Sequence, residues 1–293
     1  MKMKNLRNQS IFAFLFLLVF IPLGAEAVPP PSPAGGNYLV LDGVDDHAIL
    51  DFETFGLLLP KGTDEWTFEA WIYPTTPPDQ HIHAVVLSQQ VKMNIVNHPH
   101  DRFLKLSGEA YFDVGGEDAP NAIIVLPIRA LGMIVEFPPN QWHHIVFQTE
   151  EKQTTLIVNE LVRVLRQGIT IAPDISPARH PQAFTIGGFG EEIEFWNGNF
   201  WGHFSGYIDE VRVSKVARYD TAKRDFTPRT KFKNDAKTVA LWHFDEARGA
   251  REFSDTSGNA YHLIGRNGAK TDGEFAAVEA EGKLATIWGR LKQ

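Results

Sequence analysis

The chain has 293 residues, no cysteine and a formal net charge of −8 at pH 7. This acidic balance argues against nucleic acid as a partner, because nucleic acid requires a basic surface. The lack of cysteine excludes disulfide bonds and a cysteine-linked lipid anchor, so stability must come from the core and from any bound ions.

The first 27 residues have the pattern of a secretory signal peptide. Lys2 and Lys4 make the N-terminal end basic, residues 11–21 form an unbroken apolar run, and Ala25-Glu26-Ala27 is an A-x-A cleavage site. The apolar run is too short to span a bilayer comfortably, and no second one follows. We therefore expect a secreted protein (extracellular, cell-surface or periplasmic) that does not span a membrane.

A Pro- and Gly-rich leader, residues 28–36, precedes a series of short strand patterns. Alternating or β-branched and aromatic runs predict strands at 38–41, 66–73, 83–87, 103–106, 122–126, 133–137, 142–148, 154–158, 161–165, 184–186, 204–213 and 239–244. Turn-forming clusters separate these runs, and there is almost no helical period. The pattern indicates an all-β fold of two antiparallel sheets packed as a sandwich.

One helical pattern lies near the end of the chain. Apolar residues at i, i+3, i+4 and i+7 begin at Leu284 and end at Leu291. We interpret residues 266–293 as a polar linker, 266–273, followed by a short amphipathic helix that either docks on the body or contacts a partner. The domain itself is expected to span residues 37–265.

Five stretches of sequence carry a family resemblance. They are YLVLDGVDD at 38–46, WTFEAWIYP at 66–74, QWHHIVFQTEEKQTTLIVNELV at 141–162, FTIGGFG at 184–190 with FSGYIDEVRVSKVARY at 204–219, and VALWHFDEARGAREFSDTSGNAYHL at 239–263. In this order they resemble the laminin-G-like, concanavalin A-like jelly-roll domains of bacterial secreted proteins. The resemblance implies a jelly-roll sandwich whose relatives chiefly bind carbohydrate or protein, although fold alone does not decide function.

The stretch GYIDEVRV, residues 206–213, places two adjacent carboxylates inside a strand pattern. Strict alternation puts Asp209 on one face with Tyr207 and two valines, and Glu210 and Arg212 on the other as a solvated pair. A carboxylate among apolar neighbours must be paired, hydrogen-bonded or bound to metal. Asp209 is therefore a structural anchor, a metal ligand or a catalyst; the residue pattern favours the anchor and ranks the metal second.

Calcium is the metal that suits the acidic turns of this chain, because it prefers oxygen ligands from loops. The resemblance implies that the first and last strands lie near the strand of Asp209, which would let its carboxylate reach one of these turns. The predicted ligands are Asp42, Asp209, Asp255 and Asn259. The alternative is that the turn residues only make Asx turns with their own backbone.

No catalytic residue is predicted. Some glucanases of this fold carry a strand motif E-I-D-x-E, whose alternate positions supply the two carboxylates of retaining chemistry. Neither EEIEFW at 191–196 nor YIDE at 207–210 has carboxylates at both ends of that pattern. The chain also lacks G-x-S-x-G and any cysteine nucleophile.

Residues 195–204, FWNGNFWGHF, concentrate aromatic side chains around Asn and Gly. In a loop, such rings stack on sugars and such amides bind hydroxyls, so the predicted ligand-binding residues are Trp196, Asn197, Asn199 and Trp201; otherwise the rings cap the sandwich. We expect a non-catalytic module that recognises a glycan or a cell-surface protein, with or without a structural calcium. The alternatives are a divergent glycoside hydrolase and a structural or adhesive surface component.

Overall fold

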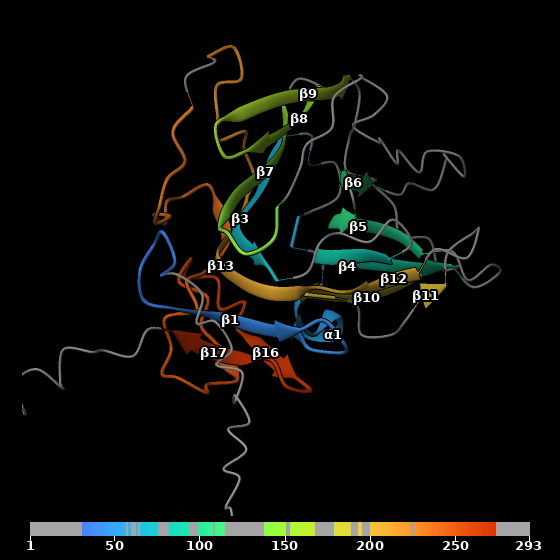
Figure 1. The fold of residues 1–293 in the computed structure, drawn as a ribbon. Helices are drawn as coiled ribbons and strands as arrows, with labels where there is room; N and C mark the ends of the chain where they lie inside the picture. Colours follow the sequence, from blue (N-terminus) through green and yellow to red (C-terminus); the bar gives the residue numbers. More distant parts are fainter. Residues whose placement is uncertain are drawn as a thin grey trace, which may run out of the picture.

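The computed structural model describes most of the predicted domain. The described residues are 31–56, 58–59, 63, 65–75, 82–93, 99–107, 109–114, 138–150, 153–167, 179–188, 193–194, 200–223 and 226–273. Their strands form two sheets that pack face to face (Figure 1). This arrangement confirms the predicted all-β sandwich.

Sheet A has eight strands, in the order β17-β1-β13-β3-β7-β8-β9 with β14 beside β13. Every pairing in sheet A is antiparallel, and β13 lies at its centre, between β3 on one side and β1 followed by β14 on the other. Figure 1 shows β9, β8, β7, β3, β13 and β1 following one another across this layer. The bounds are β1 (Asn37–Asp42), β3 (Trp66–Pro74), β7 (His143–Glu150), β8 (Gln153–Val158), β9 (Leu161–Gln167), β13 (Ser205–Ser214), β14 (Thr238–Trp242) and β17 (Lys270–Gly273).

Sheet B has nine strands, in the order β11-β12-β4-β10-β2-β16-β15, and the hairpin of β5 and β6 adds to β4. Its pairings are antiparallel except for that of β12 with β4, which is parallel. Within the residues that the structure describes there is one short helix, α1 (Phe52–Phe55), which follows β2. The bounds are β2 (His47–Leu50), β4 (Ile82–Met93), β5 (Pro99–Ser107), β6 (Glu109–Val114), β10 (Arg179–Ile186), β11 (Ile193–Glu194), β12 (Phe200–His203), β15 (Glu252–Phe253) and β16 (Leu263–Arg266).

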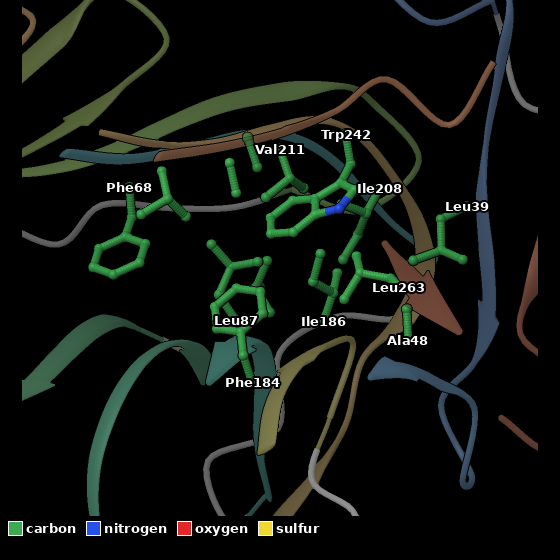
Figure 2. Packing of buried hydrophobic residues seen from close by; sticks show 14 of the residues in the cluster. Leu39, Ala48, Phe68, Leu87, Phe184, Ile186, Ile208, Val211, Trp242 and Leu263 are labelled. Atoms are coloured by element: carbon green, nitrogen blue, oxygen red, sulfur yellow. The ribbon is translucent and has the colours of Figure 1, made fainter. Parts of the chain in front are cut away.

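The core lies between the inner faces of the two sheets. Side chains of sheet A such as Ile208 and Val211 point toward Leu87 and Ile186 of sheet B (Figure 2). The ring of Phe184, from β10, stacks on the indole of Trp242, from β14, with centroids 5.6 Å apart. Full burial of side chains of this size contributes about 1.5–3 kcal/mol each, which makes this apolar layer the main source of stability.

A β-bulge in β13 reverses the alternation of its side chains. The register with β3 shifts between Asp209 and Arg212, and Glu210 has a φ of 52°. Ile208 therefore points into the core before the bulge, and Val211 does so after it, while Asp209 and Arg212 both turn to the outer face. The predicted solvated pair of Glu210 and Arg212 is wrong, because both side chains are buried.

The connection from β13 to β14, residues 215–237, lies across the outer face of sheet A, and we call it the strap. Among its described residues, Tyr219 packs against Val146 of β7. Phe232 packs against Trp71 of β3. Polar side chains on this face are consequently enclosed between a sheet and a loop, instead of facing solvent.

Each predicted strand that falls among the described residues corresponds to an observed strand, and the structure adds β2, β6, β11, β12 and β15 to β17, which were not predicted. The last of these lies beyond the expected domain end at residue 265. Strand β17 lies within residues 266–273, the predicted linker. It pairs with β1 in a register that places Thr271 opposite Leu39. Thr271 is buried and its hydroxyl donates to the Ala247 carbonyl at 2.7 Å, so a polar segment forms an ordered edge strand. The predicted strands at 122–126 and 133–137 and the predicted C-terminal helix lie outside the described residues.

Replacing Gly206 by Ala is expected to lower the free energy of unfolding by more than about 1 kcal/mol. The φ of Gly206 is 143°, and an added Cβ would lie 2.0 Å from the Tyr73 carbonyl oxygen of the neighbouring strand. Gly249→Ala is the matched control, because its φ of 84° is strained but nothing lies within 4 Å of the added Cβ. Urea unfolding should show the larger loss for Gly206→Ala; equal losses would contradict the clash.

Candidate functional site

Asp209 lies on the outer face of β13, beneath the leader. The Ser32 hydroxyl donates to its Oδ2, and the Glu210 backbone N–H donates to its Oδ1 at 2.7 Å. Burial raises the pKa of Asp209 to about 8, and the negative charges of Glu210 and Asp245 add to the rise. These contacts are those of the predicted hydrogen-bonded anchor, which fixes the leader to sheet A.

Glu210, the bulge residue, joins three parts of the chain through its carboxylate. Its Oε2 accepts from the Phe232 backbone N–H of the strap at 2.6 Å, and its Oε1 lies 2.6 Å from His243 Nδ1 after β14. The side chain of Glu210 is buried, and that of His243 is 18% exposed. Both carboxylates of the stretch at 206–213 are thus engaged by the protein itself.

A third buried carboxylate, Glu69 of β3, lies under the strap. Its Oε1 is 2.6 Å from both Nε and Nη2 of Arg212. Its Oε2 accepts from the Tyr219 hydroxyl and lies 3.7 Å from His144 Nε2. Burial acts to raise the pKa of Glu69, but the adjacent His144 imidazole and Arg212 guanidinium outweigh it, so the pKa lies below its usual value.

Arg212 and Tyr219 complete this buried network. Arg212 Nη1 donates to the Lys233 carbonyl of the strap at 3.0 Å, and its guanidinium lies 4.8 Å from the centroid of the Phe232 ring. Burial and the charge of Glu69 raise the pKa of the Tyr219 hydroxyl, so this hydroxyl stays a hydrogen-bond donor. The network has the geometry of a scaffold that joins the strap to sheet A.

The four predicted metal ligands do not gather at one point. Asp42 is opposite Ser205 in the register of β1 and β13, four residues from Asp209, which is about 13 Å along a strand. The Asp255 carboxylate accepts from the backbone N–H groups of Leu241 at 2.9 Å, Ser257 at 2.8 Å and Tyr261 at 3.1 Å.

Asn259 lies in the same turn as Asp255, and its amide donates to the Val239 carbonyl at 2.9 Å. The hydrogen bonds of Asp255 and Asn259 agree with the alternative to calcium binding, in which the side chains of turn residues bind nearby backbone groups.

Acidic side chains do gather around the turn between β1 and β2. Within the described residues, Asp42, Asp45 and Asp46 have carboxylate oxygens within 4.8 Å of one another. Burial raises the pKa of Asp46, and the charges of Asp42 and Asp45 add to the rise. This turn offers the oxygen ligands that a calcium ion prefers, and calcium binding stays a prediction.

The predicted aromatic platform lies mostly outside the described residues. Trp196, Asn197 and Asn199 are among the undescribed residues 195–199. Trp201 is in β12, where its backbone pairs with Ile193 of β11 and with His83 of β4. Trp201, the one platform residue that the structure describes, therefore lies in sheet B, on the other layer from Asp209.

Sequence reasoning missed Glu69 as a buried site residue. One signal for it was present in WTFEAWIY, because Glu69 shares its face of β3 with Trp71 and Tyr73. A face that carries two large aromatic side chains is too apolar to be solvated. A carboxylate on it calls for a buried partner, which Arg212 supplies.

The two packed sheets, antiparallel apart from the pairing of β12 with β4, define a concanavalin A-like β-sandwich. A laminin G family model, described as "Concanavalin A-like lectin/glucanases superfamily", matches residues 42–222. Because the match covers more than half of the 293 residues, the chain belongs to this family.

Several solved structures are similar to this chain at low sequence identity. The chain is similar to a Ruminococcus gnavus IT-sialidase CBM40 bound to α2,3-sialyllactose, with 12% identity, a TM-score of 0.42, and coverage of 63% of this chain and 95% of that one. It is similar to domains LG4-5 of the mouse laminin α1 chain, with 13% identity, a TM-score of 0.37, and coverage of 67% and 45%.

A SAP-like pentraxin from Limulus polyphemus is also similar, with 12% identity, a TM-score of 0.36, and coverage of 78% of this chain and 94% of that one. No curated protein matches the sequence. In the part of the chain that the structure describes, no helix has both the length and the apolar character needed to cross a membrane.

Proposed function

We propose that this protein is a secreted, non-catalytic module that binds a glycan. Membership of a family of lectins and glucanases supports a carbohydrate ligand. The signal-peptide pattern of residues 1–27 supports export. The choice of binding over hydrolysis depends on the buried carboxylates.

The observation that carries this choice is the engagement of Asp209 and Glu210. A retaining glycosidase needs two carboxyl groups about 5–5.5 Å apart, and both must reach the sugar. Asp209 is covered by Ser32, and Glu210 is held by Phe232 and His243. Carboxylates that hold the leader, the strap and β14 together are unavailable to a substrate.

The same proposal assigns the glycan to the aromatic segment at 195–204. Replacing Trp196 or Trp201 by Ala is expected to weaken glycan binding by at least about tenfold, because truncating a stacking aromatic anchor costs about 2 kcal/mol or more. Leu161→Ala is the control, since Leu161 is a 39% exposed residue at the start of β9 in the other sheet. Isothermal titration with the sugar selected below measures both.

The primary test is a screen of the purified protein against neutral and acidic oligosaccharides, followed by a reducing-sugar assay on each ligand found. We expect saturable binding without new reducing ends. Release of product at a rate that Asp209→Asn abolishes would replace the proposal with a hydrolase. Binding to no saccharide would overturn it in favour of a protein partner or a structural role.

A further inference from the structure

The strap differs in charge from the rest of the chain. Residues 215–237 contain eight Lys or Arg and three Asp, a net charge of +5. Because the whole chain carries −8, the remaining residues carry −13. A concentrated positive region on an otherwise negative protein attracts anions locally, whereas the protein as a whole repels them.

Three of these cations line one surface hollow. Arg229, Lys231 and Lys233, together with Pro228 and Thr230, surround an open depression of about 450 Å³. All three cationic side chains are exposed. Lys231 Nζ lies 2.7 Å from Asp245, whereas the side chains of Arg229 and Lys233 have no hydrogen-bond or ion-pair partner among the described residues.

The backbone under this hollow is fixed to sheet A at three points. Trp71 Nε1 donates to the Arg229 carbonyl at 3.0 Å. Glu210 accepts from the Phe232 N–H at 2.6 Å, and Arg212 donates to the Lys233 carbonyl at 3.0 Å. The segment that forms the hollow is therefore already ordered, so ligand binding loses little conformational entropy in ordering its backbone.

We propose that this hollow binds an anionic saccharide, through its carboxylate or sulfate groups. The inference rests on the proposed glycan-binding function and adds a second saccharide site, separate from the aromatic segment at 195–204, together with the charge class of its ligand. Arg229 and Lys233 supply two cations that have no side-chain partner among the described residues. Thr230, which also lines the hollow, supplies a hydroxyl that can hydrogen-bond to a sugar hydroxyl. The net charge of −8 disfavours a nucleic acid, whose long phosphate backbone would extend onto acidic surface.

The test compares polygalacturonate, dextran sulfate, neutral dextran and single-stranded DNA as ligands for the full chain. The expected result is saturable binding of at least one acidic polysaccharide, weakened at least about tenfold in Arg229→Glu/Lys233→Glu and weakened by added salt. The first two ligands separate carboxylate from sulfate recognition. Lys270→Glu is the matched control, because Lys270 is an exposed cation on β17 without a side-chain partner among the described residues.

Three results would overturn the inference: no binding of either acidic polysaccharide, equal affinity in the double variant and the wild type, or tighter binding of DNA with the same dependence on Arg229 and Lys233. The last would indicate a general polyanion site. If the inference alone fails, the neutral oligosaccharides of the earlier screen still bind and still depend on Trp196 and Trp201. If the proposed function fails, no saccharide binds at all.

Discussion

Replacing Glu69 by Gln is expected to lower the free energy of unfolding by about 3–5 kcal/mol, the usual cost of breaking a buried ion pair. Gln keeps the shape of the side chain and can still accept from Tyr219, but it leaves the guanidinium of Arg212 without its anion. Arg212 is 1% exposed, so water cannot replace the lost partner. Urea unfolding followed by tryptophan fluorescence measures the loss, and a loss below about 1 kcal/mol would contradict a buried pair.

Two further variants separate the pair from general effects of mutation. Glu69→Met/Arg212→Met removes both charges and should recover much of the loss, because apolar replacement of a whole buried pair is often neutral. Asp272→Asn breaks the ion pair between Asp272 and Arg248 at the surface, where the side chain of Arg248 is 54% exposed and that of Asp272 is 29% exposed. Its loss should cost less than about 1 kcal/mol.

The lowered pKa of Glu69 also determines how far the pH can fall before this residue stops stabilising the fold. Its stabilising contribution is present above its unfolded value of 4.5 and is lost as the pH falls through the lower folded value.

The sandwich could be predicted because its strands keep a period of two. In WTFEAWIY, Trp66, Phe68, Ala70 and Ile72 alternate with the other residues, and all four lie in the core. Alternation of this kind needs only local sequence, so the strand positions and the fold class followed from it.

The bulge at Glu210 could not be predicted in the same way. A left-handed φ is usually marked by Gly or Asn, and here a Glu adopts it. At the bulge β13 changes its neighbour on one side from β1 to β14, while β3 pairs with it on the other side, and these strands come from distant parts of the chain. One extra residue moves every later side chain to the opposite face. Strict alternation therefore does not hold across the bulge, and the prediction that Glu210 and Arg212 form a solvated pair, which assumed it, is wrong.

The position of the strap over the outer face of sheet A could not be predicted from the sequence either. The strap is polar and carries eight cationic residues, which is a composition typical of a solvated loop. It packs on sheet A through Tyr219 and Phe232, two buried aromatic side chains. The candidate site therefore owes its enclosed character to long-range packing, whereas its individual acids, Asp209 and Glu210, were visible in the sequence.

Replacing Asp209 by Asn is expected to flatten the pH dependence of stability between about pH 4 and pH 8. The folded pKa of about 8 is above the unfolded value of 3.8, so the folded state holds one proton more in this window. Stability from this group is therefore complete below pH 3.8 and is lost as the pH rises toward 8. The wild type should lose about 1.4 kcal/mol per pH unit relative to Asp209→Asn, as urea unfolding at several pH values would measure.

Ser32→Ala provides the control for this assignment. The Ser32 hydroxyl stabilises the ionised carboxylate, so its removal should extend the descending limb to higher pH and cost about 1–3 kcal/mol, because Asp209 loses a buried hydrogen bond. Parallel curves for the wild type and Asp209→Asn would contradict a protonated anchor. Calcium gives the opposite sign, because a metal ligand must be ionised: stabilisation of the wild type by millimolar calcium, absent in Asp209→Asn, would assign Asp209 to a metal site.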